Sequence, residues 1–167
     1  MNAISPRPAL AGMLAAIDRA TQTGLEGREA RVADAIAAAV ADPMLLAGLS
    51  CPCAEHGYVR HLLHAGADYA VVALVWRAGQ MSPVHAHKSW CAFGVHRGIL
   101  TEHFYAPGEP PRLEAARLRF PGDVSHGPAR PDLIHRIANC CSTTAISIHA
   151  YGTRYERFAE DLNLILA

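Results

Sequence analysis

The sequence predicts a mainly β fold, a small antiparallel barrel or sandwich that follows an N-terminal helical segment. From Tyr58 onward the chain consists of short runs rich in β-branched and aromatic residues, separated by turn residues. Before that point, apolar residues recur at helical spacing instead. With 167 residues, 51% of them hydrophobic and 18% charged, the chain has the length and composition of one globular domain over residues 1–167.

The helical segment is expected over residues 1–50, and its pattern starts at residue 8. Two stretches place apolar residues three or four positions apart, namely Leu10, Met13, Leu14 and Ile17, and then Val32, Ile36 and Val40. Gly24 and Gly27 separate the two stretches. Pro43 starts a short third turn or helix, and residues 50–57 form a loop.

The β-barrel is expected over residues 58–152. Its strands are predicted in the runs YVRHLLH, DYAVVALVW, SPVHAHKSWCAFGVH, GILTEHFY, RLEAARLRF, IHRIAN and TTAISIHAY. The short turns between these runs favour antiparallel strands over βαβ units. His126 falls in a predicted loop. Residues 153–167 are expected to close the domain by packing through Phe158, Leu162 and Leu166.

Charge and cysteine content restrict the partners and the compartment. Fifteen basic and fifteen acidic residues cancel, so we expect neither nucleic acid nor a membrane as a partner. The first twenty residues lack the apolar core of a signal peptide, and no run approaches the length of a membrane span. Five cysteines, an odd number, favour reduced thiols and a cytoplasmic protein. Cys51 and Cys53 have an unusual spacing for a metal clip.

Histidine and tyrosine positions give the candidate site. His85 and His87 would point to one face of a strand, where they either bind a metal ion or lie at the surface. In the run AISIHAY, the residues Ser147, His149 and Tyr151 share one face. Solvent exposure would explain this polar row, but the absence of charged residues from it favours the lining of a cavity.

The spacing of these residues resembles a known superfamily. From Gly79 to Gly98 the chain reads G-x5-H-x-H-x3-C-x6-G, and H-x3-N follows from His135 to Asn139. This resembles the two-part cupin signature, with Cys91 at the position where glutamate is usual. Within the cupins the chain is most similar to the thiol dioxygenases, which include cysteine dioxygenase and 3-mercaptopropionate dioxygenase. The resemblance implies a small jelly-roll-like barrel that holds Fe(II) through His85, His87 and His135.

The same resemblance assigns roles to further residues. Ser147, His149 and Tyr151 would form a hydrogen-bonded row that ends at a tyrosine hydroxyl near the iron. Cys91 is either the partner of Tyr151 in a thioether, as in animal cysteine dioxygenases, or an inert core thiol. Arg60 takes the position of the arginine that binds the substrate carboxylate, where the mercaptopropionate branch has glutamine; the alternative is a surface residue. Arg154 and Arg157 could bind the carboxylate instead.

The resemblance therefore implies a non-haem Fe(II) dioxygenase that uses O₂ to convert a small thiol carboxylic acid to its sulfinic acid. Cysteine, 3-mercaptopropionate, mercaptosuccinate and cysteamine all stay open as substrates. Two alternatives stay open as well: a metal-binding cupin without redox function, such as a sensor or storage module, and a cupin enzyme with another substrate class. The expected partners are the thiol and O₂, and the expected state is a monomer or weak homodimer.

Overall fold

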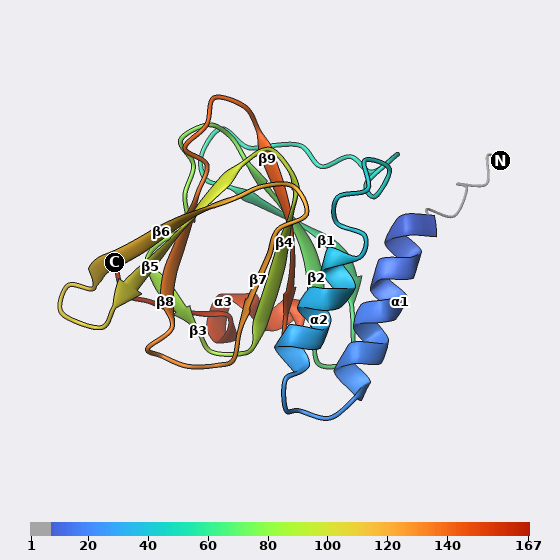
Figure 1. The fold of residues 1–167 in the computed structure, drawn as a ribbon, viewed down its shortest axis with the longest axis horizontal. Coiled ribbons are helices and arrows are strands. Elements are labelled where there is room, and N and C mark those ends of the chain that lie inside the picture. Colours follow the sequence, from blue (N-terminus) through green and yellow to red (C-terminus); the bar gives the residue numbers. More distant parts are fainter. Residues whose placement is uncertain (1–7) are drawn as a thin grey trace.

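Two antiparallel five-stranded sheets face each other, and two helices cover the outer face of one of them (Figure 1). The computed structural model describes residues 8–167. The first sheet has the strand order β1 (Val59–Ala65), β2 (Ala70–Trp76), β9 (Ala145–Tyr151), β4 (Cys91–Arg97), β7 (Val124–Gly127). The second has the order β10 (Asn163–Ile165), β3 (His85–His87), β8 (Ile134–Ala138), β5 (Leu100–Ala106), β6 (Arg112–Arg119).

This arrangement confirms the predicted fold class, a mainly β jelly roll preceded by helices. Every strand pair within the two sheets is antiparallel, and no pairing within residues 8–167 joins the sheets into a continuous barrel. The chain changes sheets between β4 and β5 at Gly98, which has a φ of +77°. A Cβ atom at this position would lie 2.8 Å from the Cα of Ala145, so glycine is required by both the backbone angle and the space.

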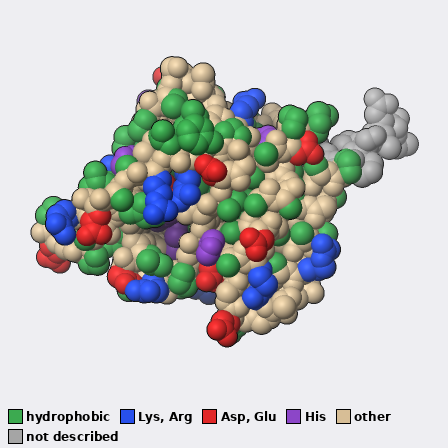
Figure 2. Space-filling model, in the orientation of Figure 1, with side chains coloured by type: hydrophobic (Ala, Val, Ile, Leu, Met, Phe, Trp, Pro, Cys, Tyr) green, Lys and Arg blue, Asp and Glu red, His purple; other side chains and the backbone are tan. Residues whose placement is uncertain are grey.

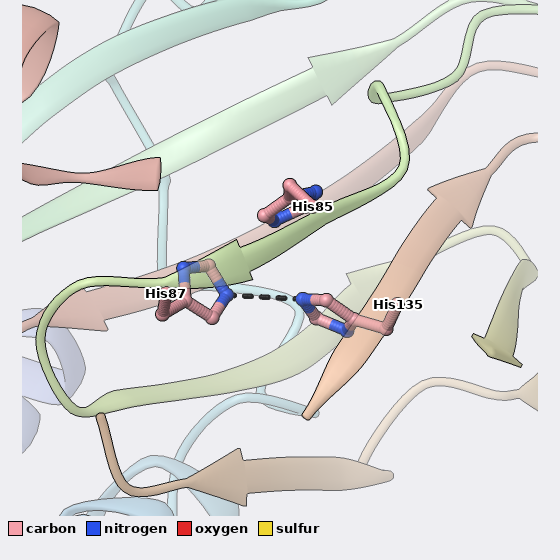
Figure 3. A group of neighbouring side chains, drawn as sticks. All are labelled: His85, His87 and His135. Atoms are coloured by element: carbon pink, nitrogen blue, oxygen red, sulfur yellow. Dashed lines mark hydrogen bonds between the residues drawn. The ribbon is translucent and has the colours of Figure 1, made fainter. Parts of the chain in front are cut away.

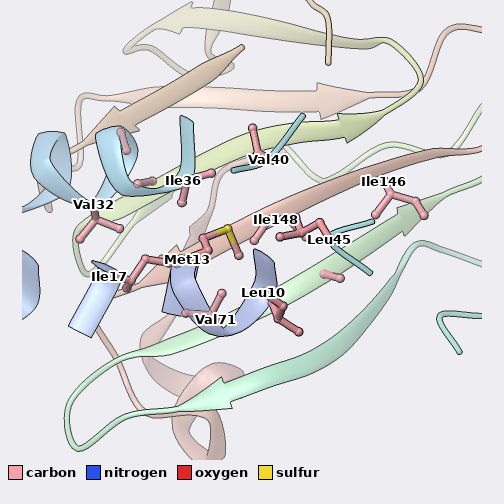
Figure 4. Packing of buried hydrophobic residues seen from close by; sticks show 14 of the residues in the cluster. Leu10, Met13, Ile17, Val32, Ile36, Val40, Leu45, Val71, Ile146 and Ile148 are labelled. Carbon is pink, nitrogen blue, oxygen red and sulfur yellow. The ribbon is translucent and has the colours of Figure 1, made fainter. Parts of the chain in front are cut away.

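The helices α1 (Pro8–Gln22) and α2 (Arg28–Ala37) pack against the outer face of the first sheet. Figure 4 shows their apolar side chains pointing toward Val71, Ile146 and Ile148. Gly94 on β4 allows close contact, because a Cβ atom there would lie 2.7 Å from Cγ2 of Ile36. After α2 the chain continues in turns, and Leu45 from the predicted third turn is fully buried.

The central strands of the first sheet are buried on both faces. In β2, Val71, Ala73 and Val75 contact the helices, whereas Val72, Leu74 and Trp76 face the second sheet. This explains why the run AVVALVW is continuously apolar instead of alternating with polar residues. The inner face of β9 is equally dry, so the polar row on that strand lines the space between the sheets.

Two sequence predictions need correction. His126 lies on the strand β7 and not in a loop, because residues 124–127 pair with β4. In the segment 153–167, Leu162 is buried and Phe158 is half-buried, but Leu166 is 36% exposed and does not pack into the core. This segment contains η1 (Tyr155–Arg157), α3 (Phe158–Asp161) and the strand β10, which pairs with β3.

Residues 1–7 of the predicted helical segment lie outside the described residues. Within residues 8–167, no helix combines the length and the apolar character needed to cross a membrane.

Replacing Ile36 by alanine should test the contact between α2 and the first sheet. Ile36 is fully buried, and we expect Ile36→Ala to lower the free energy of unfolding by about 2–5 kcal/mol through lost burial and the cavity left behind. Urea unfolding would measure this. Leu25→Ala, at a residue that is 79% exposed, is the control and should change stability by less than about 0.5 kcal/mol. Equal losses in both variants would contradict the predicted packing.

Candidate metal centre

Three histidines converge between the two sheets. His85 and His87 lie on β3, and His135 lies on β8 directly opposite His85 in the strand register. Each ring contributes one nitrogen to the cluster, and these three nitrogens all lie within 4.8 Å of one another. The Nε2 atoms of His87 and His135 are 3.0 Å apart (Figure 3). Within residues 8–167 no other group of three or more His, Cys, Asp or Glu side chains converges in this way, and Cys51 and Cys53 belong to no such group.

Hydrogen bonds at Nδ1 determine which nitrogen of each ring can bind a metal. His85 Nδ1 donates to the carbonyl oxygen of Pro83 (2.9 Å), His87 Nδ1 to Oδ1 of Asn163 (3.0 Å), and His135 Nδ1 to Oε1 of Glu102 (3.0 Å). Each Nδ1 therefore carries a hydrogen, which leaves Nε2 as the nitrogen of each ring that can bind a metal.

Burial keeps two of these rings neutral. Desolvation, followed by the charge of His135, lowers the pKa of His85 to about 4 and holds the pKa of His87 well below its usual value. The Nε2 atoms of His87 and His135, 3.0 Å apart, are close enough to share one hydrogen or to bind one cation together. Three imidazoles whose Nε2 atoms converge are thus a donor set that fits a divalent transition-metal ion.

A hydrogen-bonded chain runs along the inner face of β9 beside this cluster. Trp76 Nε1 donates to Ser147 Oγ (2.9 Å), and Ser147 Oγ lies 2.8 Å from His149 Nε2. His149 Nδ1 lies 2.9 Å from the hydroxyl of Tyr151. Ser147, His149 and Tyr151 are at most 4% exposed, so the row lines the interior, as the absence of charged residues suggested.

The indole group sets the direction of this chain, because it can only donate. Ser147 then accepts from Trp76 and donates to His149 Nε2, so that His149 donates from Nδ1 to Tyr151. The hydroxyl hydrogen of Tyr151 is left for another acceptor. Burial raises the pKa of Tyr151 well above its usual value and lowers that of His149, so both stay neutral. Trp76 therefore starts the chain.

Arg60 faces the same space. A small cavity of about 10 Å³, the size of one water molecule, is lined by Arg60, the three histidines and Tyr151. Arg60 Nη2 donates to the hydroxyl of Tyr58 (2.8 Å), whereas the buried Nε has no protein partner.

Arg154 and Arg157, the alternative carboxylate ligands, are exposed and turned elsewhere. Arg154 donates to the carbonyl of Ala67, and Arg157 pairs with Asp161. Neither lines the cavity beside the histidines.

Cys91 lies next to Tyr151. The two residues are directly opposite in the pairing of β4 with β9, and both are buried on the inner face. Cys91 is a free thiol whose pKa is raised by burial, which describes an inert core thiol equally well. The thioether with Tyr151 stays a prediction.

A second, larger cavity of about 280 Å³ reaches His87 and His135 from the side of β4, β5, β6 and β7. Its walls include Cys91, Phe93, Phe104 and Leu133, and the exposed His126 lies at its rim. Figure 2 shows histidine side chains at a hollow beside β7. The strand orders of the two sheets place this cavity on the opposite side of the cluster from Arg60.

Glu102 was missed by the sequence analysis. It is 2% exposed and contacts His135, Arg119 and Ser125. Although burial raises its pKa, the hydrogen bonds and charges of His135 and Arg119 outweigh this and lower the pKa below its usual value. One signal was available: Glu102 alternates with Leu100 and Phe104 on one face of a predicted strand, where a carboxylate is out of place.

Removing any one of the three histidines should abolish tight metal binding. We expect His85→Ala, His87→Ala and His135→Ala each to weaken Zn²⁺ or Fe²⁺ binding more than 100-fold, since losing a direct ligand exceeds the roughly 10–100-fold cost of losing an outer partner. Chelator competition would measure the affinity. His61→Ala is the matched control, because the ring of His61 bonds the carbonyl of Pro52 and should leave binding unchanged. Retained affinity in the three variants would refute the site.

Comparison with known proteins agrees with the fold and identifies the family. In fold the chain is similar to a protein of Thermus thermophilus (15% identity, TM-score 0.52, 62% of this chain and 90% of that chain). It is also similar to a double-stranded β-helix protein of Klebsiella pneumoniae (17% identity, TM-score 0.50) and to a cupin superfamily protein of Desulfitobacterium hafniense (14% identity, TM-score 0.50). Each of these two matches covers 62% of this chain and 84% of the other chain. Residues 50–160, more than half of the chain, match the family described as cysteine dioxygenase type I. The chain belongs to the cysteine dioxygenase type I family.

Proposed function

We propose that the protein is a non-haem iron(II) thiol dioxygenase that oxidises a small thiol carboxylic acid, cysteine or a similar acid, to its sulfinic acid. The observation that carries this proposal is the small cavity where three histidines, an arginine and a tyrosine meet. A site that only stores or senses a metal would have no need for the last two groups.

The reaction balances with the two substrates alone. Both atoms of O₂ become bonded to the substrate sulfur, which is oxidised as O₂ is reduced, and the thiol proton ends on the sulfinic acid or in solvent. No other reductant is required. Bound at the three histidines, iron(II) would supply the redox chemistry and the open coordination positions that O₂ and a thiolate need.

Arg60 would hold the substrate carboxylate. Its guanidinium carries a permanent positive charge, and its buried Nε lacks a protein partner, which is costly unless a ligand accepts from it. The hydrogen bond to Tyr58 and the stacking of Tyr58 on Trp76, with ring centroids 4.3 Å apart, restrict the motion of this arginine. Because the cavity of about 10 Å³ holds only about one water molecule, the substrate would displace lining side chains as it enters, and its sulfur would then face the histidines.

Tyr151 would donate a hydrogen bond to the reacting oxygen or the substrate. The chain from Trp76 through Ser147 and His149 leaves the tyrosine hydrogen available, and the tyrosine ring centroid lies 5.6 Å from that of His87. Because the donor is already oriented, little reorganisation is needed during the reaction.

We further propose that thiol and O₂ are the only partners and that the protein acts in the cytoplasm as a monomer or weak homodimer. The zero formal net charge and the free cysteines support this view.

Oxygen uptake by the iron(II)-loaded protein tests the function directly. Cysteine, 3-mercaptopropionate and mercaptosuccinate would be assayed in parallel, with the sulfinate identified by mass spectrometry. Uptake matched by sulfinate is expected with at least one thiol. No uptake with any thiol, in protein loaded stoichiometrically with iron, would exclude the proposed reaction for these substrates and favour a binding module.

Replacing Arg60 by glutamine should raise KM for the preferred thiol acid about 10- to 100-fold, because a charge-assisted hydrogen bond worth roughly 1.5–3 kcal/mol is lost. Iron content should stay unchanged. Steady-state kinetics would measure the effect, with His61→Ala on the same strand as the control. An unchanged KM would show that another group binds the carboxylate.

Tyr151→Phe should keep the metal and lower kcat by about 100-fold or more, the usual cost of removing one preorganised donor. Single-turnover rates and metal analysis would separate the two effects. The variant Ser147→Ala should show a smaller loss, because His149 then keeps its bond to Tyr151 but loses its own orienting donor. A rate in Tyr151→Phe equal to that of the unchanged protein would exclude the hydroxyl from the reaction.

A further inference from the structure

Glu102 is a buried carboxylate with every strong acceptor position in use. Its Oε1 accepts from Nδ1 of His135 (3.0 Å) and from the hydroxyl of Ser125 (3.1 Å). Its Oε2 accepts from Nε (2.9 Å) and Nη2 (2.6 Å) of Arg119. A buried charge with this many partners has one orientation, and this orientation includes the bond to a histidine of the metal centre.

The strand register places these groups together. Phe104 pairs with His135 and Leu100 with Arg119, so Glu102 is the diagonal neighbour of His135 on β8 and of Arg119 on β6. Ser125 comes from β7 in the facing sheet. The network therefore crosses three neighbouring strands and connects the two sheets at the larger cavity, where Glu102 and His135 both line the wall.

The three histidines differ in what holds their Nδ1 hydrogens. His85 bonds a backbone carbonyl, His87 bonds the amide oxygen of Asn163, and only His135 bonds a charged group. Charge-assisted hydrogen bonds are roughly twice as strong as neutral ones. A carboxylate partner also increases the electron density of the imidazole, which makes Nε2 a better donor to a metal.

We propose that Glu102, oriented by Arg119 and Ser125, is the positioning residue of His135: it keeps the hydrogen of the ring on Nδ1 and directs the Nε2 lone pair toward His85 and His87. This inference rests on the proposed function only in placing a metal ion on the three histidines. Arg119 also balances the buried negative charge of Glu102 and keeps its carboxylate from turning away from His135.

Glu102→Gln is the first test. Glutamine has one carbonyl oxygen, and the charged Arg119 should take it, so that the amide nitrogen faces His135 and donates to Nδ1. The ring hydrogen then moves to Nε2. We expect a change of His135 tautomer in the long-range ¹H–¹⁵N NMR spectrum of the metal-free protein, and about 10- to 100-fold weaker Fe²⁺ and Zn²⁺ binding in anaerobic chelator competition.

Glu114→Gln is the matched control for this variant. Glu114 also lines the larger cavity, but it is more than half exposed and forms an ion pair with the exposed Arg112. It should leave both the tautomer and the affinity unchanged. Unchanged tautomer and affinity in Glu102→Gln itself, within about threefold, would overturn the proposal.

A pair of double variants keeps the test decisive if the single variant does not fold. Arg119→Met combined with Glu102→Gln removes both charges and frees the amide oxygen to accept from His135 again. Arg119→Met combined with Glu102→Leu removes the charges and the acceptor together. We expect the glutamine variant to restore the Nδ1–H tautomer and to bind metal at least 10-fold more tightly than the leucine variant. Equal affinities in the pair would refute a positioning role.

Neither readout involves a thiol or O₂. Failure of the iron-loaded protein to form a sulfinate would therefore count against the proposed function alone, whereas an unaltered tautomer in these variants would count against Glu102 alone.

Discussion

The site depends on one condition: three imidazole rings must turn their lone pairs to the same point. This requires that each Nδ1 hydrogen has an acceptor on the side away from that point. The acceptors come from different parts of the chain, since Pro83 precedes β3, Asn163 belongs to β10 and Glu102 lies on β5. All of these strands belong to the second sheet. The strand order of this sheet therefore determines the ligand geometry.

The first sheet provides the opposite wall, and its rigidity comes from burial on both faces. The helices cover the outer side of β2, β4 and β9, which leaves the inner side free to carry a polar row without contact with solvent. In this dry space, and among residues 8–167, Ser147, His149 and Tyr151 form their side-chain hydrogen bonds with each other and with Trp76, so these bonds have a single direction. The helices that bury the outer face thus help to fix the orientation of Ser147, His149 and Tyr151 on the inner face.

Local patterns were sufficient to predict part of this arrangement. Alternation along β9 placed Ser147, His149 and Tyr151 on one face, and the i, i+2 spacing placed His85 and His87 together. His135 entered only through the resemblance to a family, because its neighbours depend on the pairing of β3 with β8. Asn163 and Glu102 were missed for the same reason: Asn163 lies 76 residues from its histidine and Glu102 lies 33 residues from His135. The strand β7 was missed because its four residues, which follow a turn, are too few to show the alternation of apolar and polar residues that identifies a strand.

The position of negative charge connects the fold to the proposed substrate. In the cupin signature that this sequence resembles, a glutamate is usual where the chain has Cys91, on β4 opposite Tyr151. A carboxylate there would lower the positive charge of a bound metal and repel an anionic thiol acid. This chain instead has its carboxylate at Glu102, behind His135, where Arg119 balances the charge. On the side of the small cavity, Arg60 is then the only fixed charge among the lining residues. A thiolate that also carries a carboxylate would meet two positive centres and no negative one, which favours a substrate with two anionic groups over one that carries an amine alone.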